Sequence, residues 1–247
     1  MAGNSGQGVA EQTAQLAKKE KIPTQISGLD SILGGGLFQG TNLLLHGSPL
    51  CGKKPLLMQF IYEGLRSDIP GVFVLTDFGY KEWKTKMASS GWDLAPFEKN
   101  GALHVIDCYS SQFEPSLQDE PHISHVPSPN ALSAISLQLA KMQEKMGQNF
   151  GSYNLAFHSL SSLLEESTPS TFHHFLQFTA GKLRKSGATS IYSLELGMHD
   201  EKDVTMVEHI MDGVIEFQEG KVRIKGLEGA SHNWHDYTIM PHGIEIR

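Results

Sequence analysis

The sequence has few cysteines and no long apolar run. Cys51 and Cys108 are its two cysteines, too few for a disulfide framework. No apolar run approaches the roughly 18 residues that span a bilayer. The first residues, MAGNSGQGVAEQ, lack the apolar core of a signal peptide. We therefore expect a reduced, cytoplasmic protein with no membrane partner.

Basic residues are in deficit. Lys and Arg number 20 against 27 Asp and Glu, so the formal net charge is −7. Nucleic-acid binders usually carry a basic face, so we expect no nucleic-acid partner, although a local basic patch stays open. The 247 residues, 39% of them hydrophobic, suit one well-buried α/β domain, and no internal repeat is visible.

Strand-like and helix-like segments alternate along the chain. This pattern predicts an α/β fold with a mostly parallel sheet covered on both faces and an antiparallel edge formed by the tail 205–247. We expect residues 1–22 to be a flexible segment and 23–247 a single domain. Strands are predicted at 41–47, 71–78, 102–109, 153–164 and 188–196, and helices at 55–67, 80–91, 130–147 (with Asn130 as a cap) and 171–187.

A polar stretch at 110–129 contains four prolines. Loops of this length are usually functional or mobile. We expect it to be a mobile or partner-facing surface that builds no buried element.

The segment GSPLCGKKPL at 47–56 nearly matches the phosphate-binding loop pattern G-x-x-x-x-G-K-[ST]. It lies between a predicted strand and a predicted helix, which is the context that such a loop requires. A turn that keeps its shape without a ligand is an equally good interpretation. The candidate nucleotide-binding residues are Gly47, Ser48, Pro49, Leu50, Cys51, Gly52, Lys53 and Lys54.

Two residues depart from that pattern. Lys54 stands where a Ser or Thr hydroxyl would bind Mg²⁺, and an ammonium repels a metal ion. Pro55 has no N–H to offer to a phosphate, and it disfavours helical angles at Lys54. We therefore expect the helix to begin at Pro55, with Lys54 outside it.

Several further motifs resemble the KaiC-like branch of the RecA-type P-loop ATPases. They are ISGLDSILGGGL before the first strand, GVFVLTDF, GWDL at 91–94, and GASH…IMPHGIEI near the end. They occur in the family's order and span roughly residues 24–247. The resemblance implies a RecA-type three-layer αβα sandwich with the nucleotide at the carboxyl ends of the strands. It also implies rings with ATP between subunits.

The same resemblance indicates what the site has lost. Asp77 and Phe78 align with the family's paired glutamates, which leaves Asp77 as a weak candidate for the base. His158 aligns with the metal-holding aspartate of Walker B, and a histidine that merely fills the former metal pocket is the plainer interpretation. Glu228 aligns with the arginine finger. Losing a base costs about 10²–10⁴ in rate and losing a finger about 10³–10⁵, although such factors do not simply multiply.

These replacements favour a catalytically inert or vestigial member of the family. We expect a regulatory or signalling module that binds an unidentified protein partner or another copy of itself. Weak binding of ATP or ADP stays open, whereas Mg²⁺ is not expected and no metal ligand is assigned. The alternative is a KaiC-like ATPase that stays active through substitute residues, with Asp77 as base and Lys54 in place of the metal.

Overall fold

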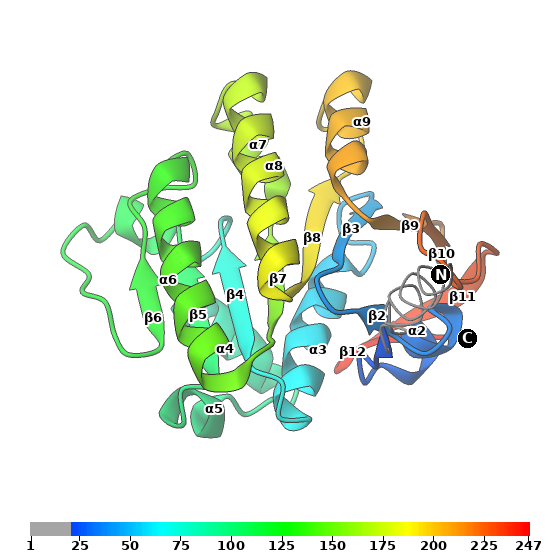
Figure 1. The fold of residues 1–247 in the computed structure, drawn as a ribbon, viewed down its shortest axis with the longest axis horizontal. Helices are drawn as coiled ribbons and strands as arrows, with labels where there is room; N and C mark the ends of the chain where they lie inside the picture. The colour runs from blue at the N-terminus through cyan, green and yellow to red at the C-terminus, as the bar shows by residue number, and fades with distance from the viewer. Residues whose placement is uncertain (1–20) are drawn as a thin grey trace, which may run out of the picture.

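The computed structural model describes residues 21–247 and forms one ten-stranded sheet with helices on both faces (Figure 1). The expectation for the flexible N-terminal segment falls mostly on residues 1–20, which lie outside the described residues. The strand order is β12-β11-β10-β9-β3-β8-β7-β4-β5-β6. Pairing is parallel from β9 through β6 and antiparallel from β9 to β12. The predicted three-layer RecA-type sandwich with antiparallel edge strands is therefore confirmed.

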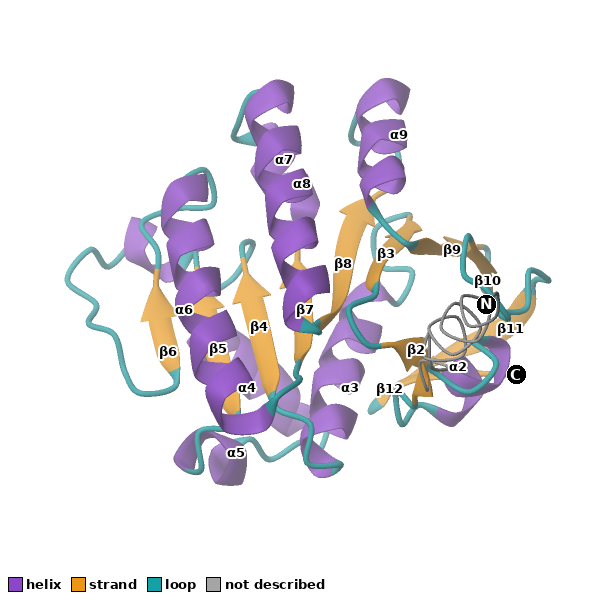
Figure 2. Cartoon of the chain, in the orientation of Figure 1, coloured by secondary structure: helices purple, strands orange, loops and turns teal. Residues whose placement is uncertain are grey.

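The strands of the main sheet are short, and those of its centre are buried along their length except for Glu195 at the end of β8. The arrows of β4, β6 and β8 point the same way in Figure 2, so their carboxyl ends share one edge. The strands are β3 (Asn42–Gly47), β4 (Gly71–Leu75), β5 (Leu103–Asp107), β6 (Ile123–His125), β7 (Asn154–His158), β8 (Thr189–Glu195), β9 (Gly213–Gln218), β10 (Lys221–Lys225), β11 (His235–Met240) and β12 (Gly243–Ile246), with β1 (Lys21–Ile22) and β2 (Leu37–Phe38) in a separate pair.

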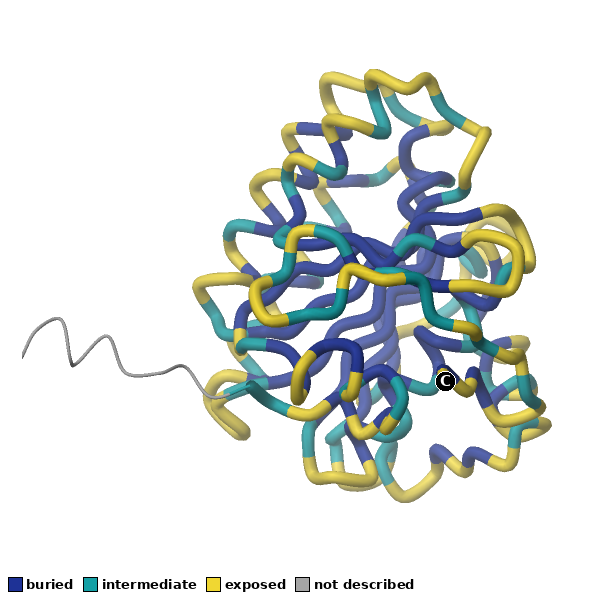
Figure 3. Tube along the Cα trace, turned by 90° about the vertical axis from the view of Figure 1, so that its right-hand side faces the viewer, coloured by how far each residue is buried: buried dark blue, intermediate teal, exposed yellow. Residues whose placement is uncertain are grey.

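Two apolar clusters hold the helices to the sheet, one on each face. Helices α2, α3 and α4 pack on one face, and α6, α7, α8 and α9 on the other, so that buried chain runs through the middle in Figure 3. The helices are α2 (Ser27–Ile32), α3 (Lys53–Arg66), α4 (Tyr80–Ser89), α5 (Ala95–Lys99), η1 (Ser110–Gln112), α6 (Leu132–Phe150), α7 (Leu160–Glu165), α8 (Pro169–Ser186) and α9 (Glu201–Ile210). None of the helices in the described part of the chain is long and apolar enough to cross a membrane.

Four local predictions were wrong. The stretch 110–129 contains β6, which pairs with β5 and buries Ile123. The strand predicted at 153–164 is only the strand β7, which ends at His158, and α7 follows it. The Ser159 hydroxyl accepts from the Ser161 N–H and so caps the start of this helix. Helix α6 begins after Ala131, so Asn130 is not its cap. Helix α9 occupies the start of the tail.

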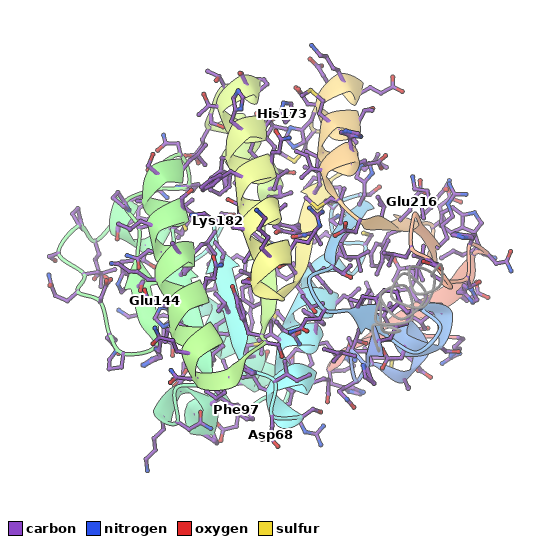
Figure 4. The ribbon with its side chains drawn as sticks, viewed as in Figure 1. Asp68, Phe97, Glu144, His173, Lys182 and Glu216 are labelled. Atoms are coloured by element: carbon purple, nitrogen blue, oxygen red, sulfur yellow. The ribbon has the colours of Figure 1, made fainter. Side chains whose placement is uncertain are left out.

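Helix α9 joins the domain through the buried Val207 and the partly buried Val204 and Ile210, and polar contacts add to this packing. His173 of α8 lies beside α9, with its Nε2 3.8 Å from Asp203 Oδ1 (Figure 4). Glu208 approaches His46 at the end of β3, 3.6 Å away. Of the two adjacent histidines, His173 is buried between helices and His174 is exposed.

His104 on β5 supplies a pH-dependent part of the stability. It is 3% exposed, its Nε2 lies 2.9 Å from Ser124 Oγ on β6, and burial lowers its pKa to about 4. In the unfolded chain, His104 takes up a proton near its ordinary pKa of about 6.5. The stabilisation by the neutral, buried His104 is therefore complete above pH 6.5 and is lost as the pH falls toward 4.

We therefore predict that His104→Asn removes roughly 3 kcal/mol from the fall in unfolding free energy between pH 7 and pH 4. Urea unfolding at both pH values measures this. His242→Asn, at an exposed histidine, is the matched control and should leave the pH dependence as it is. An unchanged pH dependence in His104→Asn would contradict the assignment.

Candidate functional site

Four neighbouring parallel strands bring the predicted site residues to one edge of the sheet. In the order β3-β8-β7-β4, they end at Gly47, Glu195, His158 and Leu75, and Asp77 follows β4 by two residues. In open α/β sheets, ligands bind outside the carboxyl ends of the strands. Strand β3, which ends at the loop, lies inside the sheet with β8 and β9 on either side of it.

The loop 47–54 is built by two glycines. A side chain at Gly47 would meet the Phe217 Cβ at 2.7 Å and the Cys51 Sγ at 2.9 Å. Gly52 has a φ of +108°, which lets the chain turn directly into α3 at Lys53. The prediction that the helix starts at Pro55 was therefore wrong: Lys54 is its second residue. Proline is tolerated there because N–H groups of the first turn have no intrahelical partner.

Lys53 is folded back onto the loop. Its Nζ donates to the carbonyl oxygens of Gly47 at 2.6 Å and Ser48 at 2.7 Å, and to Glu195 Oε2 at 2.9 Å. The residue is 4% exposed. Glu195 at the end of β8 thus neutralises the charge that a phosphate would otherwise meet.

Lys54 rests on an aromatic ring. Its Nζ lies 3.9 Å from the centroid of Phe78, and Lys86 Nζ of α4 lies 4.9 Å from the same centroid. Burial lowers the pKa of Lys54, and the neighbouring charge of Lys86 lowers it further. Lys54, at the Ser/Thr position of the phosphate-loop pattern, therefore contacts Phe78 through a cation–π interaction.

Asp77 and His158 form the wall opposite the loop. The Asp77 carboxylate accepts from the Thr76 hydroxyl at 2.9 Å and from Ser162 Oγ. His158 Nδ1 lies 3.5 Å from Asp77 Oδ2 with no hydrogen bond, and the His158 ring packs edge-on against Phe78, 5.0 Å between centroids. Burial lowers the pKa of His158 to about 4, so the imidazole is neutral at pH 7.

These residues surround a cleft of about 450 Å³. Such a volume is typical of small-molecule sites. Sequence reasoning missed Glu195, Lys86 and Ile239, although Glu195 ends a predicted strand in the same way as Asp77 follows one. The cleft is lined by Pro49, Leu50, Gly52, Lys53, Lys54, Pro55, Asp77, Lys86, His158, Glu195 and Ile239.

Other residues singled out in the sequence lie elsewhere. Glu228 is exposed on the loop after β10, where its carbonyl oxygen accepts from Lys21 Nζ. Lys225 contacts Glu208 and Glu216. Cys51 is partly buried in the loop, its Sγ 3.5 Å from Lys53 Nζ.

The lining residues do not fit Mg²⁺. Both carboxylates of the cleft are engaged, Asp77 with two hydroxyl donors and Glu195 with Lys53. Lys54 places a cation where a hydroxyl would coordinate the metal. Among the described residues no three His, Cys, Asp or Glu side chains are grouped as a metal centre.

Residues 22–247 match the family model described as KaiC ATPase. A UPF0273 protein of Aeropyrum pernix is 26% identical over 92% of this chain and 93% of its own length. The circadian clock oscillator protein KaiC of Synechococcus elongatus is also 26% identical over 92% of this chain, which spans 44% of that protein.

A crystal structure of a KaiC-like protein from Pyrococcus horikoshii has the same fold, with a TM-score of 0.70 and 24% identity. The alignment covers 92% of this chain and 99% of that one. Together with the match over nearly the whole described chain, this makes the protein a member of the KaiC-like family of RecA-type P-loop ATPases.

Proposed function

We propose that this protein is a KaiC-family module that has lost metal-dependent hydrolysis and acts by binding a protein partner or another copy of itself. Its cleft binds a nucleotide weakly and without Mg²⁺. The observation that carries the proposal is the Lys54 ammonium over Phe78, at the place where the metal and a glutamate would act.

The charges of the cleft support metal-free binding of phosphates. Lys53, Lys54 and Lys86 line the cleft with three ammonium groups and Asp77 and Glu195 with two carboxylates, while Glu82, outside the lining, pairs with Lys86. Lys54 lies between the loop and Lys86 and has no carboxylate within salt-bridge distance among the described residues. A phosphate oxygen beside Lys54 would make a charge-assisted hydrogen bond with the ammonium. A metal ion at the same place would be repelled by it.

The alternative is an ATPase that works through Asp77. A general base must lie within hydrogen-bond reach of the attacking water. Asp77 faces the cleft, but its Oδ1 already accepts from Thr76 and Ser162. The engaged carboxylate and the apolar Phe78 favour the inert module over this alternative.

We predict that ATP binds with the same affinity, within about threefold, in Mg²⁺ and in chelator. Isothermal titration calorimetry measures both, and phosphate release from the same samples should stay at the level of buffer. Lys54→Thr combined with His158→Asp restores a hydroxyl and a carboxylate, and this variant should gain affinity with Mg²⁺. Wild-type binding at least about tenfold tighter with Mg²⁺ would overturn the proposal. Phosphate release that Lys53→Ala abolishes would favour the ATPase.

We also predict that Glu195→Gln strengthens ATP binding in chelator by about threefold to tenfold. Lys53 must leave Glu195 to reach a phosphate, and a partly exposed ion pair contributes about 1 kcal/mol. Glu245→Gln on β12, which removes an exposed carboxylate outside the cleft, is the control. Weaker binding in Glu195→Gln would show that Glu195 supports the ligand instead of competing with it.

A further inference from the structure

A second, smaller cleft of about 210 Å³ adjoins the first. Lys54, Pro55 and Lys86 line both clefts, so the two lysines stand at the junction. The second cleft is otherwise formed by Met58 of α3, the end of α4 and the segment after it, and the turn between β11 and β12. The phosphate cleft thus continues past Lys54 instead of ending there.

The second cleft is mainly apolar and contains a fixed aromatic ring. Met58, Trp92, Met240 and Pro241 contribute apolar surface. Trp92 is 6% exposed and stacks on Tyr62, with 5.4 Å between ring centroids, so the indole is held in place. A flat group with little charge suits this cleft, and a nucleobase is such a group; because Trp92 is almost fully covered, the base would lie mainly against Met240 and Pro241.

The junction favours an anion that runs through it. Lys54 and Lys86 both lie over Phe78, which is 3% exposed; Lys86 is also paired with Glu82 of the same helix, which leaves Lys54 as the ammonium without a carboxylate partner among the described residues. In a hydrolytic site the terminal phosphate would face a base and a water. Here it would face two ammonium groups and, beyond them, an apolar cleft, so the bound chain of phosphates can carry a second organic group at its far end.

We propose that the two clefts together bind a dinucleoside polyphosphate. The phosphates lie along Gly52, Lys53, Lys54 and Lys86. One nucleoside lies in the larger cleft, near Leu50 and Ile239, and the other lies in the cleft of Met58, Trp92 and Pro241. The first half of this inference rests on the proposed metal-free nucleotide site, and the second half rests on the adjoining cleft.

The test compares two ligands with the same number of phosphates, adenosine 5′-tetraphosphate and diadenosine tetraphosphate. Both are titrated into the full chain in chelator by calorimetry. We expect the dinucleoside ligand to bind at least about tenfold tighter, since its second adenosine enters the apolar cleft. Equal affinities would overturn the inference, and the adjoining cleft would then be left for an apolar side chain of a partner.

A pair of variants shows where the extra affinity of the dinucleoside ligand comes from. Ser89 lines the smaller cleft and is exposed, so Ser89→Phe should fill the opening and remove the extra affinity while leaving adenosine tetraphosphate binding unchanged. Ala88→Phe is the control, because Ala88 is the exposed neighbour of Ser89 on α4 and lies outside the cleft lining. This variant should keep the extra affinity for diadenosine tetraphosphate. Persistence of the full gain in Ser89→Phe would contradict the placement. Failure of both ligands and of ATP to bind would overturn the proposed function and this inference together.

Discussion

The contact between the Lys54 ammonium and the Phe78 ring fixes a positive charge in the middle of the cleft. In the function that we propose, the Lys54 ammonium would repel a metal ion and the Phe78 ring cannot act as a base. At 3.9 Å from the ring centroid, each residue gives the other a partner. His158 belongs to the same cluster, because its neutral ring packs edge-on against Phe78. Lys54, Phe78 and His158 therefore pack as one connected cluster.

The rest of the fold keeps this cluster in place. Strands β3, β8, β7 and β4 are paired in parallel and fully buried over most of their length, so their carboxyl ends hold the loop, Glu195, His158 and the Thr76–Phe78 segment in fixed register. Tyr237 of β11 donates to the Cys51 carbonyl oxygen from below the loop. The loop is thus held by protein contacts alone, through the Lys53 ammonium, Glu195 and Tyr237.

Much of the fold could be predicted, because apolar runs such as TNLLLHG and GVFVL are short, buried and bounded by turn residues. The errors arose where local hydrogen bonds or sheet pairing override composition. Ser159 starts α7 inside an apolar run, and β6 forms in a proline-rich stretch because β5 offers it an edge. The loop could be found from the spacing of its glycines and lysine, and Asp77 from the resemblance to the family, whereas Glu195 and Lys86 could not. Their approach to Lys53 and Phe78 depends on strand order and helix rotation, which one sequence does not show.

The most direct test of the central claim, that Lys54 stands in for the metal ion, is a titration of ATP into Lys54→Ala in the presence of chelator. If the ammonium supplies the charge that Mg²⁺ supplies elsewhere, removing it should weaken binding by at least about tenfold relative to the wild type. Binding of the wild-type affinity by Lys54→Ala would contradict the account and would leave the Lys54–Phe78 contact with a role in packing alone.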